Sequence, residues 1–308
     1  MESLPVSKSA YLFPLATVIA WAGNGIVSKM SVDVVSPGTI AFYRWLLAAL
    51  VLLPFVAKTL WRQRQAIRKQ FFKLSVLGAL GMVVLQTLTY VSAQTTSATN
   101  IALIGSVVPM MTMAWGVMLN RERPTQGMIA GSLISFLGLS VLLTQGQPLA
   151  LLHQPLNQGD ILLLLGAICY GLYGVLLRRW KLPFSTWPSL FLQMTMGALW
   201  LLPVYLTQAD RSVSAEAWPM VLFAALVASL FATYSWLRGI QALGANRCTA
   251  FMNLNPLIGT GLAIWLLEES LAPSHCLGGG LTLLGVFLTQ RLKSPVRLRR
   301  RRLPVTEG

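Results

Sequence analysis

Residues 98–122 read ATNIALIGSVVPMMTMAWGVMLNRE, and residues 245–269 read ANRCTAFMNLNPLIGTGLAIWLLEE. One ungapped shift of the chain superposes these two stretches and extends beyond both of them. It pairs Gln94 with Gln241, Ala98 with Ala245, Pro109 with Pro256, Glu122 with Glu269, Gly131 with Gly278 and Gly138 with Gly285. Chance rarely aligns prolines, glycines and a charged residue together. The second half of the chain therefore repeats the first.

The earlier part of the first half has a counterpart under a slightly different shift. This shift pairs Gly25 with Gly174, Lys29 with Arg178, Phe42 with Phe191, and Leu52-Leu53-Pro54 with Leu201-Leu202-Pro203. The repeated unit thus covers most of each half. It also gives the first apolar run a partner in mid-chain, so we interpret that run as part of the mature fold and not as a secretory signal.

Apolar runs long enough to cross a bilayer, about 17–25 residues each, recur along the chain. We predict ten spans, at 11–30, 38–57, 73–92, 98–119, 125–144, 159–178, 184–206, 218–240, 246–266 and 273–291. Because each repeat holds an odd number of spans, the second copy enters the membrane inverted. Inverted repeats are typical of transporters whose two halves rock about a central site. The sequence predicts an all-α integral membrane protein, with repeats at 11–144 and 159–291 and a basic tail at 292–308.

The composition agrees with a membrane protein. Only 11% of the 308 residues are charged and 55% are hydrophobic, with a mean hydropathy of +0.64, whereas a soluble domain carries about 25% charged residues. A cytosolic enzyme is excluded. The net charge of +15 resides in short clusters and in the tail. This pattern favours anionic lipid headgroups over nucleic acid, which we do not expect as a partner.

The distribution of positive charge predicts the topology. If the amino terminus is cytoplasmic, nearly all of the 24 Lys and Arg fall on the cytoplasmic side, many of them in a basic connection at 58–72. Lys29 and Arg211 lie on the other side, and Arg44 lies within a span. The positive-inside rule then places both termini in the cytoplasm.

The residues that usually build catalytic or metal sites are sparse. The three cysteines, Cys169, Cys248 and Cys276, are odd in number and have no C-x-x-C spacing, and the two histidines, His153 and His275, fall in predicted connections. We therefore expect no disulfide, metal site, cofactor or catalytic residue, and no enzymatic activity.

Several motifs resemble those of the EamA-type transporters of the drug/metabolite transporter superfamily. They are Ala20-Trp21-Ala22-Gly23-Asn24-Gly25, Phe42-Tyr43-Arg44, Pro109 with Arg121-Glu122-Arg123, Asn255-Pro256, Glu268-Glu269 and the glycine-rich last span. The resemblance covers about residues 11–291. It implies ten helices in two inverted repeats, a bacterial inner membrane, and export of amino acids, related metabolites or drugs.

Arg44 is the ionisable residue that lies deepest within a predicted span. An arginine at mid-bilayer costs roughly 2.5–3.5 kcal/mol on insertion scales, so partners or water must offset it. Two interpretations stay open. Arg44 anchors a substrate carboxylate or a gate, or it is a structural tether to Asp33 or to backbone oxygens.

Polar and aromatic residues accompany Arg44 on the predicted spans. We predict a substrate cavity from Asn24, Arg44, Gln86, Tyr90, Asn100, Tyr170, Tyr173, Tyr234, Trp236, Asn253 and Asn255. Uncharged polar groups with aromatics suit a zwitterionic or amphipathic solute. The alternative for each residue is an interhelical hydrogen bond or a place in an interfacial aromatic belt.

Pro109 and Pro256 fall in mid-span, where each removes one helix hydrogen bond. We expect helix kinks that either shape the cavity and its gating or serve packing alone. Glu122 and Glu269 fall at span ends, where pairing with neighbouring cations is expected. Because no Asp or Glu lies mid-bilayer, coupling runs through rim acids or the protein is a uniporter.

The glycines of the last span in each repeat recur at seven-residue spacing, so each pair lies on one helix face. This face either packs the two spans against neighbouring helices within one chain or builds a homodimer. The function we predict is export of small metabolites by alternating access. Import within the same fold and flipping of a lipid-linked sugar are the alternatives, and a membrane-embedded enzyme or scaffold is disfavoured.

Overall fold

The computed structural model describes residues 8–31, 34–92, 95–96, 104–153, 157–267 and 273–294, which form helices and connections without a strand. The first half contains η1 (Lys8–Tyr11), α1 (Leu12–Met30), α2 (Pro37–Arg62), α3 (Arg64–Gly78), η2 (Ala79–Val84), α4 (Leu85–Ser92), α6 (Val108–Asn120) and α7 (Gln126–Leu143). The second half contains η3 (Pro148–His153), α8 (Gln158–Trp180), α9 (Thr186–Leu206), α10 (Trp218–Leu222), η4 (Phe223–Phe231), α11 (Ala232–Leu243), α12 (Ala245–Thr249), η5 (Ala250–Asn253), α13 (Leu254–Leu267) and α14 (Pro273–Arg291).

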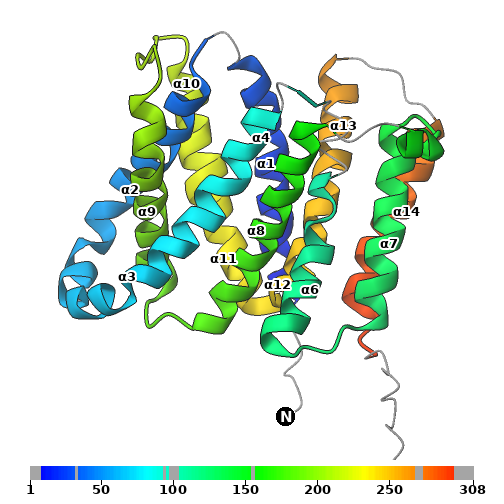
Figure 1. Cartoon of the computed structure of the whole chain (residues 1–308), viewed down its shortest axis with the longest axis horizontal. Coiled ribbons are helices and arrows are strands. Elements are labelled where there is room, and N and C mark those ends of the chain that lie inside the picture. The colour runs from blue at the N-terminus through cyan, green and yellow to red at the C-terminus, as the bar shows by residue number, and fades with distance from the viewer. Residues whose placement is uncertain are drawn as a thin grey trace, which may run out of the picture.

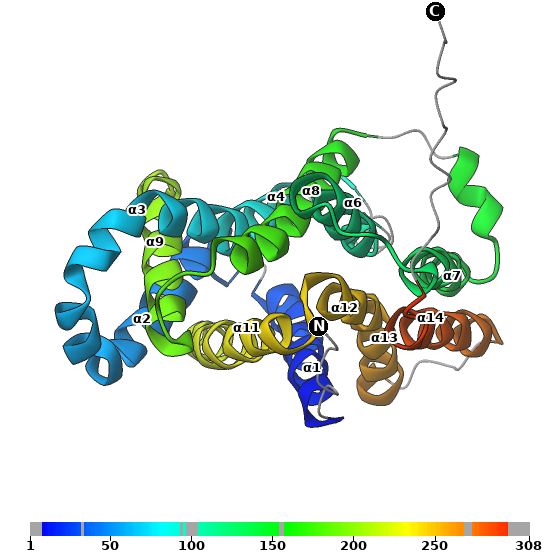
Figure 2. The ribbon, with the colours of Figure 1, turned by 90° about the horizontal axis from the view of Figure 1, so that it is seen from below.

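These helices form the predicted all-α bundle of ten transmembrane spans in two inverted repeats. The third span is α3–η2–α4, the eighth is α10–η4–α11, and the ninth is α12–η5–α13. Figure 1 shows that the described chain begins and ends on the same side of the bundle. Figure 2 shows α1, α8 and α11 near the middle, with α2, α3 and α9 at one end and the pair α7–α14 at the other.

The prediction of a non-helical basic connection at 58–72 is wrong. Helix α2 continues to Arg62, and after Gln63 helix α3 begins at Arg64. Lys, Arg and Gln are good helix formers, so a charged stretch that leaves the hydrocarbon core can stay helical in water. The third span therefore begins well before its apolar part, and Figure 1 shows α3 running obliquely away from α2.

The two mid-span prolines also differ from the expected kinks. Each lies in the first turn of a helix that follows a break: Pro109 is the second residue of α6, after a turn at 106–107. Pro256 is the third residue of α13, after the 3-10 segment η5. In a first turn the missing proline N–H is no loss, because that donor has no intrahelical acceptor. The prolines mark equivalent helix breaks in the two repeats.

Equivalent helices of the two repeats also share a π-helical segment. Segment η2 lies in the third span and η4 in the eighth, and the shift that relates the repeats carries η2 into the C-terminal part of η4. A π-helical turn widens the helix and alters its hydrogen-bond ladder, and such turns are frequent at functional sites.

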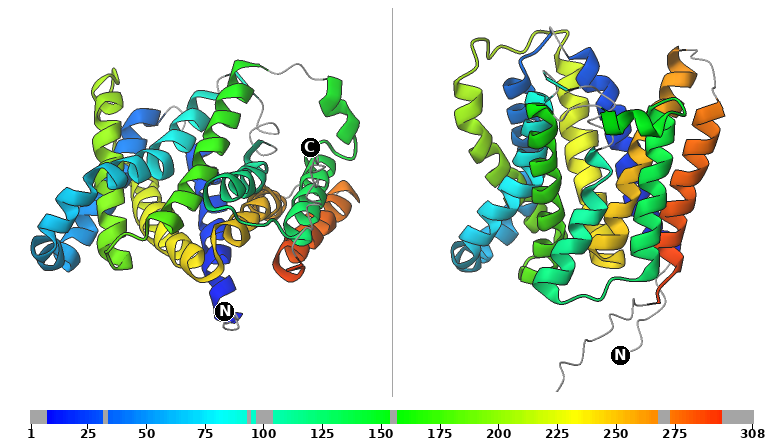
Figure 3. Two further views of the ribbon diagram at one scale, coloured as in Figure 1. Left: turned by 60° about the horizontal axis from the view of Figure 1, so that its bottom comes forward. Right: turned by 45° about the vertical axis from the view of Figure 1, so that its right-hand side comes forward.

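Helices α7 and α14 pack through their glycines. A Cβ atom on Gly138 would lie 2.5 Å from the backbone nitrogen of Thr282, and one on Gly285 would lie 2.5 Å from the carbonyl oxygen of Gly131. The Ser135 hydroxyl donates to the Thr282 carbonyl at 3.0 Å. Both side views in Figure 3 show the two helices side by side. The alternatives for this glycine face were packing within one chain and a homodimer. The structure shows packing within the chain.

Candidate functional site

Four aromatic rings meet in the middle of the bundle and form what we call the aromatic centre: Trp21 of α1, Tyr170 and Tyr173 of α8, and Trp236 of α11. The ring centroids of Trp21 and Trp236 are 5.1 Å apart, and those of Tyr170 and Tyr173 are 5.6 Å apart. Tyr170 also lies 6.4 Å from Trp21 and 6.3 Å from Trp236. These separations are typical of tilted and edge-to-face aromatic contacts.

Hydrogen bonds hold two of the four rings. The Tyr173 hydroxyl donates to Oε1 of Gln193 at 3.1 Å, and the Gln193 amide nitrogen donates in turn to Ser189. The Trp21 indole nitrogen donates to the Ala228 carbonyl at 3.1 Å. The Trp236 indole nitrogen is buried and has no acceptor among the described residues. The aromatic centre therefore offers one buried donor that a solute or water can use.

Arg44 lies on α2, and only 1% of its surface is exposed. Its Nε donates to the Ser229 hydroxyl at 2.7 Å, and its guanidinium carbon lies 5.0 Å from the ring centroid of Trp45. Ser229 belongs to the π-helical segment η4. The predicted candidate partner Asp33 lies outside the described residues.

Segment η4 joins Arg44 to the aromatic centre. Ser229 accepts from Arg44 on one side, while the preceding residue, Ala228, accepts from Trp21 on α1. One turn further, the Ala232 carbonyl accepts from the Thr17 hydroxyl of α1 at 3.0 Å. Side chains of α1 thus satisfy backbone carbonyls in and just after the π-helical segment, as the apolar interior requires.

The remaining predicted cavity residues differ in what the structure describes of them. Tyr234 turns away from the aromatic centre and stacks on Trp187, with centroids 4.1 Å apart. Asn24 is partly buried on α1. Oxygens of Gln86, Asn253 and Asn255 are buried without a donor among the described residues. The Tyr90 side chain and all of Asn100 lie outside what the structure describes.

Glu122 joins the two repeats at the end of α6. Its carboxylate accepts from the Asn246 amide at 2.9 Å and from the Asn120 amide at 3.2 Å. Asn246 belongs to α12, in the second repeat. The expected pairing of Glu122 with a neighbouring cation is not among its described contacts; an amide donates to each of its carboxylate oxygens instead. Glu269 lies outside the described residues.

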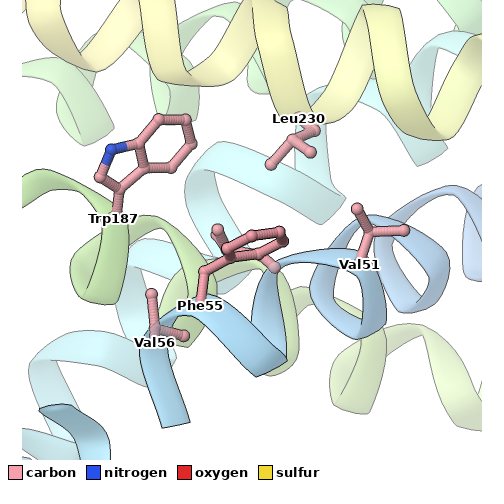
Figure 4. A pocket seen from close by; sticks show the side chains of 6 residues that line it. Val51, Phe55, Val56, Trp187 and Leu230 are labelled. Carbon is pink, nitrogen blue, oxygen red and sulfur yellow. The ribbon is translucent and has the colours of Figure 1, made fainter. Parts of the chain in front are cut away.

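A groove of about 400 Å³ opens between α2, α9 and η4. Its lining is largely apolar, from Val51, Leu52, Phe55, Val56, Trp187 and Leu230. In Figure 4, Phe55, Trp187 and Leu230 surround a common space. We call this feature the α2–α9 groove.

Sequence reasoning missed two residues at the aromatic centre and Arg44, namely Trp21 and Ser229. Trp21 appeared only as part of a family motif, although its position in the middle of a span is unusual for a tryptophan that serves an interface. Ser229 is the only polar residue in the run FAALVASLF at 223–231. A lone hydroxyl in such a run signals a partner on another helix.

The comparison with protein families is decisive. The EamA-like transporter family matches residues 8–144 and 157–291. This chain belongs to the EamA-like transporter family. As a member of it, the chain is a multi-pass membrane transporter and not an enzyme.

Several relatives match about nine tenths of this chain. The "Uncharacterized transporter YyaM" of Bacillus subtilis is 27% identical over 281 residues, which are 90% of this chain and 92% of the relative. The "Uncharacterized inner membrane transporter YicL" of Salmonella typhimurium is 24% identical, covering 92% of this chain and 95% of its own length. The "Probable terminal-alkyne amino-acid exporter" of Streptantibioticus cattleyicolor is 24% identical, covering 94% and 95%.

A solved structure supports the fold of this EamA-like transporter. A crystal structure matches it with a TM-score of 0.74 at 19% identity, covering 93% of this chain and 99% of the other. At that identity the likeness shows the fold alone.

Proposed function

We propose that this transporter exports small amino-acid-like or other amphipathic metabolites. The observation that carries the substrate class is the aromatic centre. It combines four rings with a buried indole N–H at Trp236 that has no acceptor in the described part of the chain, and its four residues carry no charged side chain. Aromatic faces and uncharged polar groups recognise a solute that is apolar at one end and zwitterionic or polar at the other. The similarity to a probable amino-acid exporter supports the direction.

The same proposal places the protein in the inner membrane with both termini in the cytoplasm. Basic residues lie in the last turns of α2, α8 and α14, and Arg121 directly follows α6; Figure 1 has these ends on one side of the bundle. Such a bias is what the positive-inside rule associates with the cytoplasm. One relative is named as an inner membrane transporter.

Alternating access would move the repeats, which we assign to 11–144 and 159–291, about the aromatic centre. The helix breaks before Pro109 and Pro256 lie at equivalent places in the two halves and supply hinges for that motion. The lining of the α2–α9 groove is largely apolar, whereas a flippase for a lipid-linked sugar needs a polar lateral groove. We therefore favour a small-solute exporter.

The test compares metabolites in the medium of cells that express the wild-type chain, Trp236→Phe or Trp218→Phe. Trp236→Phe keeps a smaller aromatic ring in the aromatic centre and removes the N–H that has no acceptor among the described residues. Trp218→Phe makes the same substitution at the start of the same span, outside the centre. We expect a zwitterionic or amphipathic solute to accumulate outside wild-type and Trp218→Phe cells, and at least severalfold less outside Trp236→Phe cells at equal membrane yield.

Proteoliposomes complete the test. Uptake of the best solute, with and without a pH gradient, measures coupling directly. Depletion of that solute from the medium would instead identify an importer. If Trp236→Phe and Trp218→Phe export alike, the aromatic centre is not the binding site.

A further inference from the structure

Two cations follow the lining residues of the α2–α9 groove along α2, toward the end of that helix. Val51 and Phe55 line the groove, and Lys58 and Arg62 follow them on α2 at i+7 and i+11 from Val51. With 3.6 residues per turn these four side chains share one helix face. Lys58 and Arg62 lie about 10 Å and about 16 Å from Val51 along the helix axis.

The two cations are accessible at the surface of α2. Both are exposed. No ion pair with a carboxylate is recorded for either one across the described residues. A lysine and an arginine that extend an apolar stripe at a helix end are placed to meet anionic groups at the membrane surface.

Aromatic residues indicate the depth of the groove. Trp61, next to Arg62, is 73% exposed, and the Arg64 guanidinium carbon lies 5.2 Å from its ring centroid. An exposed tryptophan with a cation over its ring is typical of the interfacial belt. The groove residues of α2 precede Trp61 and lie closer to mid-membrane. The groove is therefore at the level of the acyl chains, whereas Lys58 and Arg62 are at the level of the headgroups.

The groove itself is shaped to hold a chain. Leu52 and Val56 are buried, while Phe55 is 80% exposed. Trp187 forms the opposite wall, and its stacking on Tyr234 fixes its ring. Water finds few hydrogen-bond partners in a void whose lining is largely apolar.

We propose that the α2–α9 groove binds an anionic phospholipid. One acyl chain lies against Val51, Phe55, Trp187 and Leu230, and the headgroup phosphate contacts Lys58 and Arg62. This assignment does not depend on the cargo. It places the lipid on two helices from different repeats, α2 and α9.

Native mass spectrometry of the full chain in detergent, titrated with dioleoyl phosphatidylglycerol or dioleoyl phosphatidylcholine, tests the headgroup contact. A cation near the membrane surface contributes roughly fivefold to binding of an anionic lipid. The double variant Lys58→Gln/Arg62→Gln should therefore bind phosphatidylglycerol at least about tenfold more weakly. Arg68→Gln/Lys69→Gln removes the same charge from α3, away from the groove, and should bind it as the wild type does.

The acyl-chain contact is tested separately. Val51→Trp fills the groove and leaves both cations in place, whereas Leu50→Trp adds the same ring at an exposed neighbour outside the lining. We expect Val51→Trp alone to lower phosphatidylglycerol binding. Equal losses in both charge variants would mean non-specific attraction, and equal binding of phosphatidylcholine would refute the anionic headgroup. Unchanged binding in Val51→Trp would refute the groove.

Discussion

At the scale of the residue, Arg44 illustrates what one charged side chain requires inside a bilayer. Its insertion costs roughly 2.5–3.5 kcal/mol, and it is almost fully buried. The Ser229 hydroxyl and the Trp45 ring surround it. These contacts offset part of the cost. They support the interpretation of Arg44 as a structural tether.

We predict that Ser229→Ala lowers the free energy of unfolding by roughly 1.5–3 kcal/mol, because it removes a buried hydrogen bond to a charged group. Thermal unfolding in detergent measures the change. Ser140→Ala is the matched control, since its hydroxyl is also buried but bonds only to Phe136 of its own helix. Equal effects of the two substitutions would mean that the contact with Arg44 has no special weight.

Transport and membrane yield of Arg44→Ala together distinguish the two interpretations of Arg44. We expect Arg44→Ala to impair transport per inserted molecule while membrane yield stays near normal. If Arg44→Ala lowers only the yield, and transport per molecule is unchanged, Arg44 is a tether alone.

Tyr173 gives a second prediction at this scale. Tyr173→Phe should destabilise the fold by roughly 1–3 kcal/mol, because Oε1 of Gln193 loses its described donor in a buried place. Tyr234→Phe serves as the control, since its ring stacks on Trp187 and its hydroxyl has no recorded partner among the described residues. A loss in Tyr234→Phe as large as that in Tyr173→Phe would contradict the argument.

The sequence could indicate the depth of Arg44 and the polarity of the spans, but it could not pair the side chains. Tyr170, Tyr173 and Trp236 do meet, whereas Tyr234, although two residues before Trp236, faces Trp187. Which predicted residues converge depends on helix rotation, and in spans that are apolar on every side the hydrophobic pattern defines rotation poorly.

At the scale of the element, the close packing of α7 against α14 requires glycines, which carry no side chain, at the contact. Gly278 and Gly285 of α14 lie against backbone atoms of α7, and backbone atoms cannot move aside as a flexible side chain can. Close backbone approach through small residues is the main source of helix association in lipid.

We predict that Gly285→Ala destabilises the protein by roughly 1–3 kcal/mol through overpacking. Gly280→Ala, on the same helix, meets no atom within 4 Å, and should be neutral or stabilising by up to about 1 kcal/mol because alanine favours the helix. Unfolding of both variants measures the difference. A Gly285→Ala protein as stable as Gly280→Ala would show that the helices can separate without cost.

The π-helical segments were beyond the reach of sequence reasoning. Segment η4 is almost uniformly apolar, so a pattern with 3.6 residues per turn and a wider one look the same. The number and order of the spans were predictable, since length and hydropathy alone determine them. The helical extension of α2 and α3 through 58–72 was not predictable, because a hydropathy scan detects only the apolar part of a helix.

At the scale of the whole molecule, the contact of Glu122 with Asn246 links the repeats on the side where the basic helix ends gather. Alternating access requires the two halves to separate there in one of the two states. In the alternating-access mechanism that we propose, these hydrogen bonds belong to the state in which this side is closed.

We predict that joining these positions stops transport. In a chain with Cys169→Ala, Cys248→Ala and Cys276→Ala, the pair Glu122→Cys/Asn246→Cys would be bridged by a short, reducible thiol cross-linker. Transport in proteoliposomes should fall to background after bridging and recover after reduction. Each single cysteine treated in the same way is the control. Full transport in the bridged protein would mean that this side does not open.

The contacts between α7 and α14 carry a further consequence for the ancestry of the chain. Gly131 meets Gly285 and Gly138 meets Gly278, and the repeat relates Gly131 to Gly278 and Gly138 to Gly285. Such reciprocal contacts are the signature of a two-fold symmetric dimer, here enclosed in one polypeptide. Duplication and fusion would free each copy to diverge: the Ser135 hydroxyl crosses to Thr282, while that of Thr282, at the equivalent position, bonds within its own helix.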